Sequence, residues 1–84
     1  MKKVILLKEV FEATPMSRSQ AKGLYGGWEA YEEVEIDFDG IEWMGQGFAH
    51  QLFVVFQREQ PHIELKPIHM AEDVRKMYNH VIHS

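Results

Sequence analysis

The sequence predicts a small α/β domain with a mostly parallel sheet and with its helices mainly on one face. Segments with the hydrophobic period of a strand alternate with segments that have the period of a helix, in the order β-α-β-α-β-α. Strands separated by helical crossovers in this way form parallel sheets with right-handed connections. A length of 84 residues suits one domain, so we expect residues 1–84 to share a single core.

The first strand and the first helix are predicted from the N-terminal third of the chain. A continuous apolar run at residues 4–7 is typical of a strand, and Val10 and Phe11 either extend it or start a short second strand. Ser17, with Gln20 three residues later, has the signature of a helix N-cap with a capping box. The helix should bend or fray at its glycine pair, Gly26-Gly27. Its apolar face comprises Ala21, Leu24, Tyr25, Trp28 and Tyr31.

The remaining elements continue this alternation. Residues 34–38 alternate apolar and acidic side chains, which predicts a strand with one partly wet face, and Asp39-Gly40 predicts a turn. After Gly47, the apolar residues from Phe48 to Phe56 follow a broad helical stripe, although their Val and Phe content would equally suit a strand. A short strand is expected at residues 63–65, closed by Pro67. The last segment is the clearest helix, with Glu72 and Asp73 in its first turn and basic residues toward its end. Its apolar face comprises Met70, Val74, Met77, Tyr78 and Val81.

Composition excludes several classes of protein. The net charge of −4 disfavours binding to nucleic acid, and the basic residues are scattered along the chain. No apolar run approaches the length of a membrane span. The absence of cysteine removes disulfides, thiolate metal sites and thiol nucleophiles. We therefore expect a cytoplasmic protein of bacterial type, without a nucleic-acid partner, a membrane partner or a cofactor.

The most informative segment is residues 36–48, which reads as a strand, a loop and the start of a helix. Such a junction exposes backbone N–H groups and the positive end of a helix. The segment contains no Ser, Thr, Cys, Lys or Arg, so it has no nucleophile and no cation to hold a phosphate. We therefore expect a binding or regulatory surface at this place and not an enzyme.

Two functions remain open for this surface. Trp43 could anchor a protein partner, since tryptophan is favoured at binding hot spots. Gly45-Gln46-Gly47 could instead bind an anion, which would make the chain a sensor of a small ligand or nucleotide through the helix N-terminus after Gly47. A simpler role for these glycines is a tight turn between strand and helix. We favour protein binding, through Trp43, Gly45, Gln46, Gly47, His50 and Gln51.

Other polar residues allow sharper but less favoured interpretations. Asp37 and Asp39 share one face of their strand and could act as an acid–base pair or hold a hard cation. Their simpler role is a solvated strand end that starts a turn. His80 and His83 have a spacing that zinc could use, but surface histidines at the end of a helix fit better. We expect no metal site.

Three segments together resemble the STAS-like domain family of unknown function, a relative of the STAS domains of anti-sigma-factor antagonists. They are Ser17 to Ala21, Ile36 to Ile41, and Gly45 to Ala49. The likeness extends over residues 17–82. It implies a small regulatory domain that works with a signalling protein, such as a kinase or an anti-sigma-like ATPase.

The resemblance also places a phosphorylation switch that this chain lacks. In antagonist STAS domains a kinase phosphorylates a serine at the start of the helix after a central strand. That serine falls on Gly47 here, so the acceptor hydroxyl is absent. Docking at this surface is still expected without the switch. A second copy of the chain is a further expected partner, because a small sheet has an edge to cover.

Overall fold

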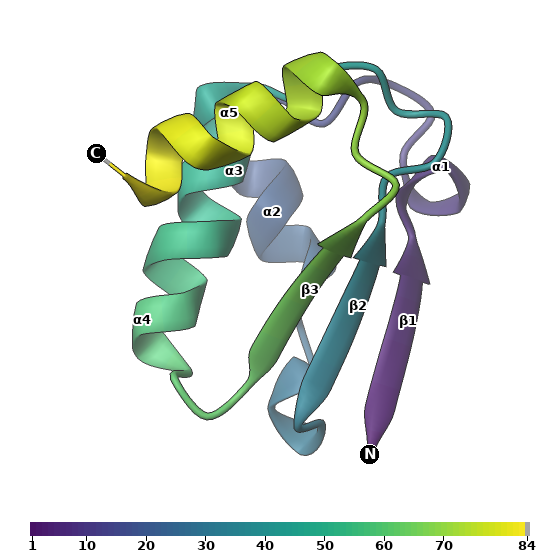
Figure 1. Ribbon diagram of the computed structural model, residues 1–84. Coiled ribbons are helices and arrows are strands. Elements are labelled where there is room, and N and C mark those ends of the chain that lie inside the picture. Colours follow the sequence, from purple (N-terminus) through teal and green to yellow (C-terminus); the bar gives the residue numbers. More distant parts are fainter. Residues whose placement is uncertain (84) are drawn as a thin grey trace.

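Three parallel strands form one sheet, in the order β1-β2-β3, in the computed structural model (Figure 1). The structure describes residues 1–83, and the strands are β1 (Lys2–Leu6), β2 (Glu33–Asp37) and β3 (Glu64–Ile68). Right-handed crossovers between sequential parallel strands place the connecting helices on the same face. Figure 1 shows α2 behind the sheet and no element in front of it. The predicted architecture is confirmed.

The first crossover starts with a short helix, α1 (Leu7–Val10). The expectation that Val10 and Phe11 extend the strand is wrong. Leu7 is completely buried and turns the chain towards the helical layer, while Val10 stays half exposed. Phe11 then packs edge-on against Phe48, with 5.8 Å between ring centroids.

Helix α2 (Arg18–Leu24) begins with the predicted capping box. The Ser17 hydroxyl accepts the Gln20 N–H at 3.2 Å, and the Gln20 side-chain oxygen accepts the Ser17 N–H at 2.8 Å. The helix is shorter than predicted, because the glycine pair breaks it. Gly27 has a φ of +85°, and a separate 3₁₀ turn, η1 (Trp28–Ala30), buries Trp28.

The second crossover is a continuous helical segment made of α3 (Gln46–His50), the π-helical η2 (Gln51–Phe56) and α4 (Gln57–Glu59). It confirms the helix expected after the second strand. The final helix, α5 (Glu72–Ile82), has Glu72 and Asp73 in its first turn as predicted, and Met70 of the predicted apolar face precedes it. Among residues 1–83, no helix combines the length and the apolar character that a bilayer crossing requires.

Strand β3 does not stop at Pro67, as the sequence suggested, but continues to Ile68. Glu64 donates its N–H to Glu32, and Ile68 accepts the N–H of Phe38, so both residues direct their backbone groups to β2. Because these groups alternate in direction along a strand, Pro67 lies with its missing N–H on the outer edge. A proline at this position therefore costs no bond of the sheet.

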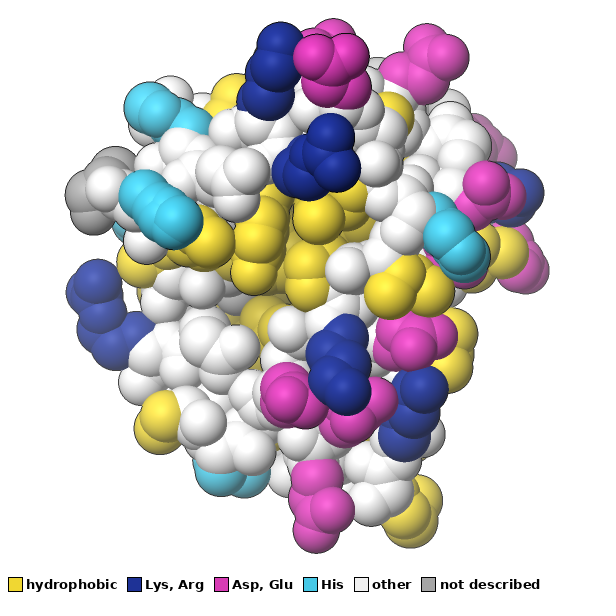
Figure 2. Space-filling model, in the orientation of Figure 1, with side chains coloured by type: hydrophobic (Ala, Val, Ile, Leu, Met, Phe, Trp, Pro, Cys, Tyr) yellow, Lys and Arg dark blue, Asp and Glu magenta, His cyan; other side chains and the backbone are white. Residues whose placement is uncertain are grey.

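The two faces of the sheet differ in polarity. The covered face contributes Val34 and Ile36 to the core, and both are completely buried. The open face carries a row of ion pairs, which include Lys2 with Glu35 at 3.0 Å and Lys66 with Glu33 at 3.4 Å. Figure 2 shows acidic and basic side chains intermingled on the lower part of this face. The expectation of a partly wet sheet face is confirmed.

We predict that Ser17→Ala lowers the free energy of unfolding by about 1 kcal/mol, because the N–H of Gln20 loses its cap. Ser19→Ala is the matched control, since Ser19 is exposed inside the same helix and makes no cap. Urea denaturation measures both. Equal effects of the two substitutions would show that the capping box does not stabilise the fold.

Candidate functional site

The loop between β2 and α3 starts with a fixed turn. Gly40 has a φ of +81°, which favours glycine, and Ile41 donates its N–H to the carbonyl of Phe38 at 2.8 Å. The Asp37 carboxylate accepts the N–H of Asp39 at 2.9 Å. The loop therefore leaves the strand in one defined direction.

The other end of the loop is held by a close backbone contact at Gly45. Its N–H donates to the carbonyl of Pro15 at 2.9 Å, and a Cβ added to it would lie only 2.5 Å from the carbonyl oxygen of Met16. Its φ of −78° is ordinary, so the predicted tight turn is wrong for this residue. Glycine is required here because the segment before α2 packs directly on its Cα. Met44, just before it, is completely buried.

The same segment also provides a hydrogen-bond acceptor for one of the free backbone N–H groups at the start of α3. The Met16 carbonyl accepts the N–H of Phe48 at 3.1 Å, and Ala49 donates to the carbonyl of Gly45. Among residues 1–83, no acceptor is bonded to the amides of Gln46 and Gly47. The Met16 carbonyl thus occupies the Phe48 amide but not those of Gln46 and Gly47, and the anion-sensor alternative stays a prediction.

A chain of polar side chains lies beside this helix start. Arg18 approaches His50 Nδ1 at 3.1 Å and donates to the side-chain oxygen of Gln51 at 3.3 Å. Gln51 in turn donates to the hydroxyl of Tyr25 at 3.0 Å. Because arginine only donates, Nδ1 of His50 is the acceptor in this contact. These hydrogen bonds link α2 to the helical segment that begins with α3. Both the oxygen and the nitrogen of the buried Gln51 side chain therefore have a hydrogen-bond partner.

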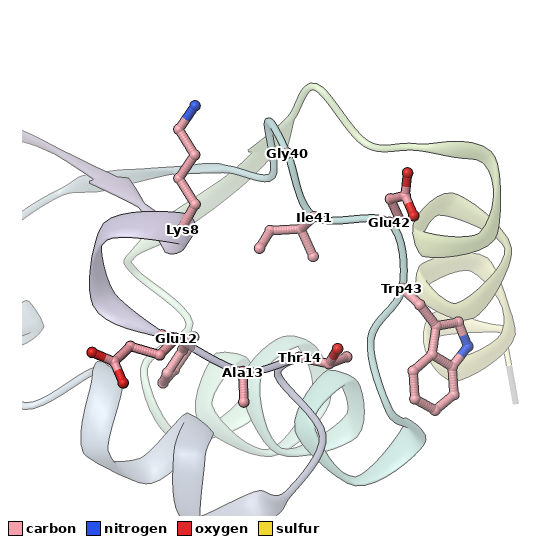
Figure 3. Close-up of a pocket in the computed structure, with 9 residues that line it drawn as sticks. Lys8, Glu12, Ala13, Thr14, Gly40, Ile41, Glu42 and Trp43 are labelled. Atoms are coloured by element: carbon pink, nitrogen blue, oxygen red, sulfur yellow. The ribbon is translucent and has the colours of Figure 1, made fainter.

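A surface cleft of about 660 Å³ lies between the segment after β1 and the β2–α3 loop (Figure 3). Figure 3 shows Ile41 directed into the cleft, while the ring of Trp43 points away from it. The Trp43 side chain is 42% exposed, directly before buried Met44. The lining residues are Lys8, Phe11, Glu12, Ala13, Thr14, Gly40, Ile41, Glu42 and Trp43.

The structure separates the predicted site residues into two groups. Trp43 and Gln46 are exposed, and Gly47 and His50 are partly exposed. The two others, Gly45 and Gln51, are buried, and we place them under the surface as its support. Direct contact of a partner with these two would require the fold to open.

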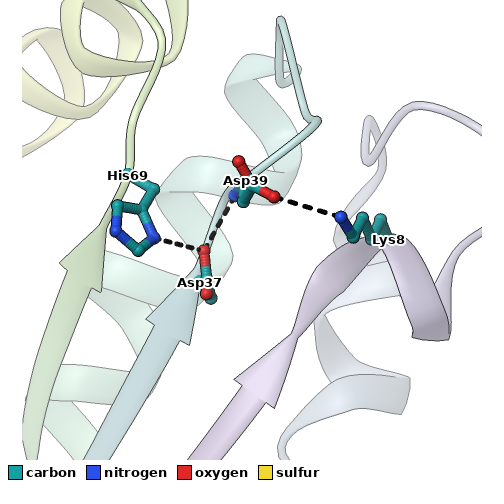
Figure 4. Close-up of polar contacts among 4 residues, drawn as sticks. All are labelled: Lys8, Asp37, Asp39 and His69. Carbon is teal, nitrogen blue, oxygen red and sulfur yellow. Dashed lines mark hydrogen bonds and ion pairs between the residues drawn. The ribbon is translucent and has the colours of Figure 1, made fainter.

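The carboxyl ends of the strands carry a second polar group (Figure 4). His69 Nδ1 lies 2.9 Å from the Asp37 carboxylate, and Lys8 lies 3.0 Å from that of Asp39. The hydrogen bond from the Asp39 amide, followed by that from His69, lowers the pKa of Asp37. The hydrogen bond to Asp37 and its charge raise the pKa of His69, whose backbone has a φ of +56°.

These pairs change the interpretation of the two aspartates. Asp37 and Asp39 point to different partners, one to His69 on the β3 side and one to Lys8 on the β1 side. Within residues 1–83, no three His, Cys, Asp or Glu side chains gather as a metal ion would require. The contacts that the structure gives the two aspartates link the end of β2 to Lys8 and to His69.

Sequence reasoning missed the residues that come from other elements. Met16 lies just before α2, Arg18 is the first residue of α2, and His69 follows β3. Each of the three contacts a residue about 30 positions away in the sequence. The capping box locates the start of α2, but no local pattern indicates which later segment it touches. The sequence offers one indirect signal for the packing of Met16 on Gly45, namely a glycine at a position where no turn requires one.

One comparison with known proteins found a match. The sequence profile of a family described as a STAS-like domain of unknown function (DUF4325) matches residues 20–75. No curated protein and no solved structure matches the chain. The matched range includes the whole β2–α3 loop and the helix start, whereas the packing segment at Pro15 and Met16 precedes it.

We predict that Gly45→Ala destabilises the fold by about 1–3 kcal/mol, because its Cβ would overlap the Met16 backbone. Gly23→Ala is the matched control, since no atom lies within 4 Å of its added Cβ and alanine favours the helix. Thermal and urea unfolding of both variants test this. Equal stability of the two variants would contradict the close contact.

The His69–Asp37 pair predicts a pH dependence of stability. The pKa of His69 is raised from its ordinary 6.5, so its contribution is complete below about pH 6.5 and is lost as pH rises through the raised pKa. The pKa of Asp37 is lowered from 3.8, so its contribution is present above pH 3.8 and is lost as pH falls through the lowered pKa.

His69→Asn should therefore reduce the decline of stability above pH 6.5, while asparagine tolerates the positive φ. Asp37→Asn should lower the pKa of His69 in an NMR titration. The control is His62→Asn, because His62 is exposed and makes no hydrogen bond or ion pair within the described chain. Identical pH profiles for the wild type and His69→Asn would contradict this role.

Proposed function

This chain belongs to the family of STAS-like domains of unknown function, and we propose that it is a non-enzymatic regulatory module that binds a protein partner. The proposed surface consists of Trp43, Gln46, Gly47 and His50, at the β2–α3 loop and the first turns of the following helix. Gly45 and Gln51 support it from below. We further propose a cytoplasmic location and a partner of signalling type, such as a kinase or an anti-sigma-like ATPase.

The observation that carries this proposal is the exposure of Trp43 on a loop whose two ends are held in place. Its ring is substantially exposed, although Met44, the next residue, is completely buried. The turn at Gly40 and the backbone contacts of Gly45 fix the two ends of the loop. A large aromatic side chain held on a pre-ordered loop can bind with little loss of conformational entropy, which is the property of a hot-spot anchor.

Polar groups at the start of α3 support the same assignment. The amides of Gln46 and Gly47 have no acceptor in residues 1–83, and Gln46 is exposed while Gly47 is partly exposed. Arg18 and His50 add a charged and a polar side chain beside the start of α3. An apolar anchor surrounded by polar groups is the usual arrangement of a protein-binding patch.

The arrangement also fits binding without phosphorylation at this site. Gly47, at the position of the phosphorylated serine in related domains, has no hydroxyl. A Cβ there would make ordinary contacts, at 3.4 Å from the Met16 carbonyl oxygen and 3.6 Å from Cγ of Arg18. Packing therefore leaves room for a side chain at Gly47, so the glycine is not required by the fold. Constitutive docking fits this surface better than a switch.

An enzymatic role has little support from the described side chains. Ser17 is engaged in the cap of α2, and Ser19 lies on the exposed side of that helix. His69, which is hydrogen-bonded to the Asp37 carboxylate, follows β3 and does not belong to the β2–α3 loop. Among residues 1–83, no serine, threonine or tyrosine hydroxyl is hydrogen-bonded to the His69 side chain. We therefore propose binding and not catalysis.

The test is a quantitative binding assay with each partner captured from the source cell and then purified. Trp43→Ala combined with Gln46→Arg should weaken binding by about 10- to 30-fold or more, as expected for loss of a hot spot. Ile82→Ala is the matched control, because Ile82 is 40% exposed on α5 and lies outside the surface. Unchanged affinity of the double variant for every partner would refute the proposed surface.

A further inference from the structure

The two edges of the sheet differ in their capacity to pair with another strand. On β3, Pro67 removes the N–H that would face outward, which protects that edge. On β1, the residues that face β2 are Met1, Lys3 and Ile5, since Glu32 donates to the carbonyl of Met1. Lys2, Val4 and Leu6 therefore direct their N–H and C=O groups away from the sheet. Figure 1 shows no element beside this edge.

The open edge also exposes apolar surface. Val4, at the middle of β1, is 57% exposed, and Val10 nearby is 50% exposed. Both line a hollow of about 450 Å³ on the open sheet face, and its two acidic residues are Glu9 and Asp37. An exposed β-branched side chain on an unpaired edge is the surface that strand addition buries.

We propose that β1 pairs antiparallel with β1 of a second copy of this chain, around a two-fold axis at Val4. In this register Val4 faces the second copy's Val4, and the two residues exchange both backbone hydrogen bonds. Lys2 faces the second copy's Leu6, and the reverse contact follows from the symmetry. The result is one continuous sheet in which β3, with its proline, forms both outer edges.

Charge supports this register over its alternatives. The side chain of the second copy's Lys2 lies next to Leu6, at the hollow whose charged residues are Glu9 and Asp37. A register centred on Lys2 would instead place two ammonium groups opposite each other. A register centred on Leu6 would pair Val4 with a residue of α1, where the strand has ended. The Val4 register alone pairs all three outward residues with attractive or neutral neighbours.

The interface is small, because each copy contributes one strand of five residues. We therefore expect association at high protein concentration and fast exchange, not an obligate dimer. The strand edge is separate from the Trp43 surface, which lies on the loop after β2. Dimer formation and partner binding are accordingly independent properties.

The first test is sedimentation velocity from about 10 µM to about 1 mM protein, a range in which a weak dimer changes its population. The wild type should shift from monomer to dimer. Val4→Pro should remain a monomer, because it removes an outward N–H while the bonds of Lys3 and Ile5 to β2 stay. Circular dichroism verifies that the variant is folded. If Val4→Pro unfolds the chain, Val4→Lys tests the same edge by charge repulsion.

The second test uses the absence of cysteine in this chain. Val4→Cys should form an intermolecular disulfide under mild oxidation, because directly opposed residues in an antiparallel pair lie within disulfide range. Met16→Cys is the matched control, since Met16 is 52% exposed but lies away from β1. A wild type that stays monomeric at every concentration overturns the proposal, as does a dimer that persists in Val4→Pro and Val4→Lys. Equal cross-linking of the two cysteine variants also overturns it.

Discussion

The segment before α2 and the start of α3 are joined by backbone contacts, and these contacts set how the two crossovers pack. The Pro15 carbonyl accepts the N–H of Gly45 at 2.9 Å, and the Met16 carbonyl accepts the N–H of Phe48 at 3.1 Å. The two crossovers of the fold meet at this point, one from β1 and one from β2. The contact is possible only because Gly45 has no Cβ, since any side chain would overlap the Met16 backbone.

The proposed surface is a consequence of this contact. Because the segment is fixed, Ser17 caps α2 in place, and Arg18 reaches His50 and Gln51 on the neighbouring helix. The loop that ends at Gly45 then holds Trp43 exposed directly before buried Met44. The features that would recognise a partner are therefore held by backbone packing as well as by side chains.

The carboxyl ends of the strands are tied by a second, electrostatic set of contacts. Asp37 and Asp39 extend from the central strand and reach His69 on one side and Lys8 on the other. Through these two aspartates β2 holds the residues that follow both of its neighbours. Together with the packed segment at Gly45, they define the end of the sheet from which the proposed surface projects.

The order of the elements, the parallel sheet with its helices on one face and the capping box of Ser17 could all be predicted from the sequence. These features depend on local periodicity and on hydrogen bonds within one turn, which neighbouring residues decide. The sequence also located the loop that contains Trp43. The strand expected at Val10 and Phe11 was wrong, because burial of Leu7 overrides local strand preference. The end of β3 was also misplaced, because the effect of Pro67 depends on which side its missing N–H faces.

The packing of the site residues could not be predicted from local sequence and is visible only in the folded chain. The tertiary structure showed that Gly45 serves a close approach and not a turn, and that Gln51 is buried between Arg18 and Tyr25. It also brought His69 to Asp37, across 32 positions of sequence. The physical reason is common to all three: each role depends on an atom contributed by a distant segment. Such a contact leaves no periodic signal in either segment, and it exists only when the crossovers have packed together.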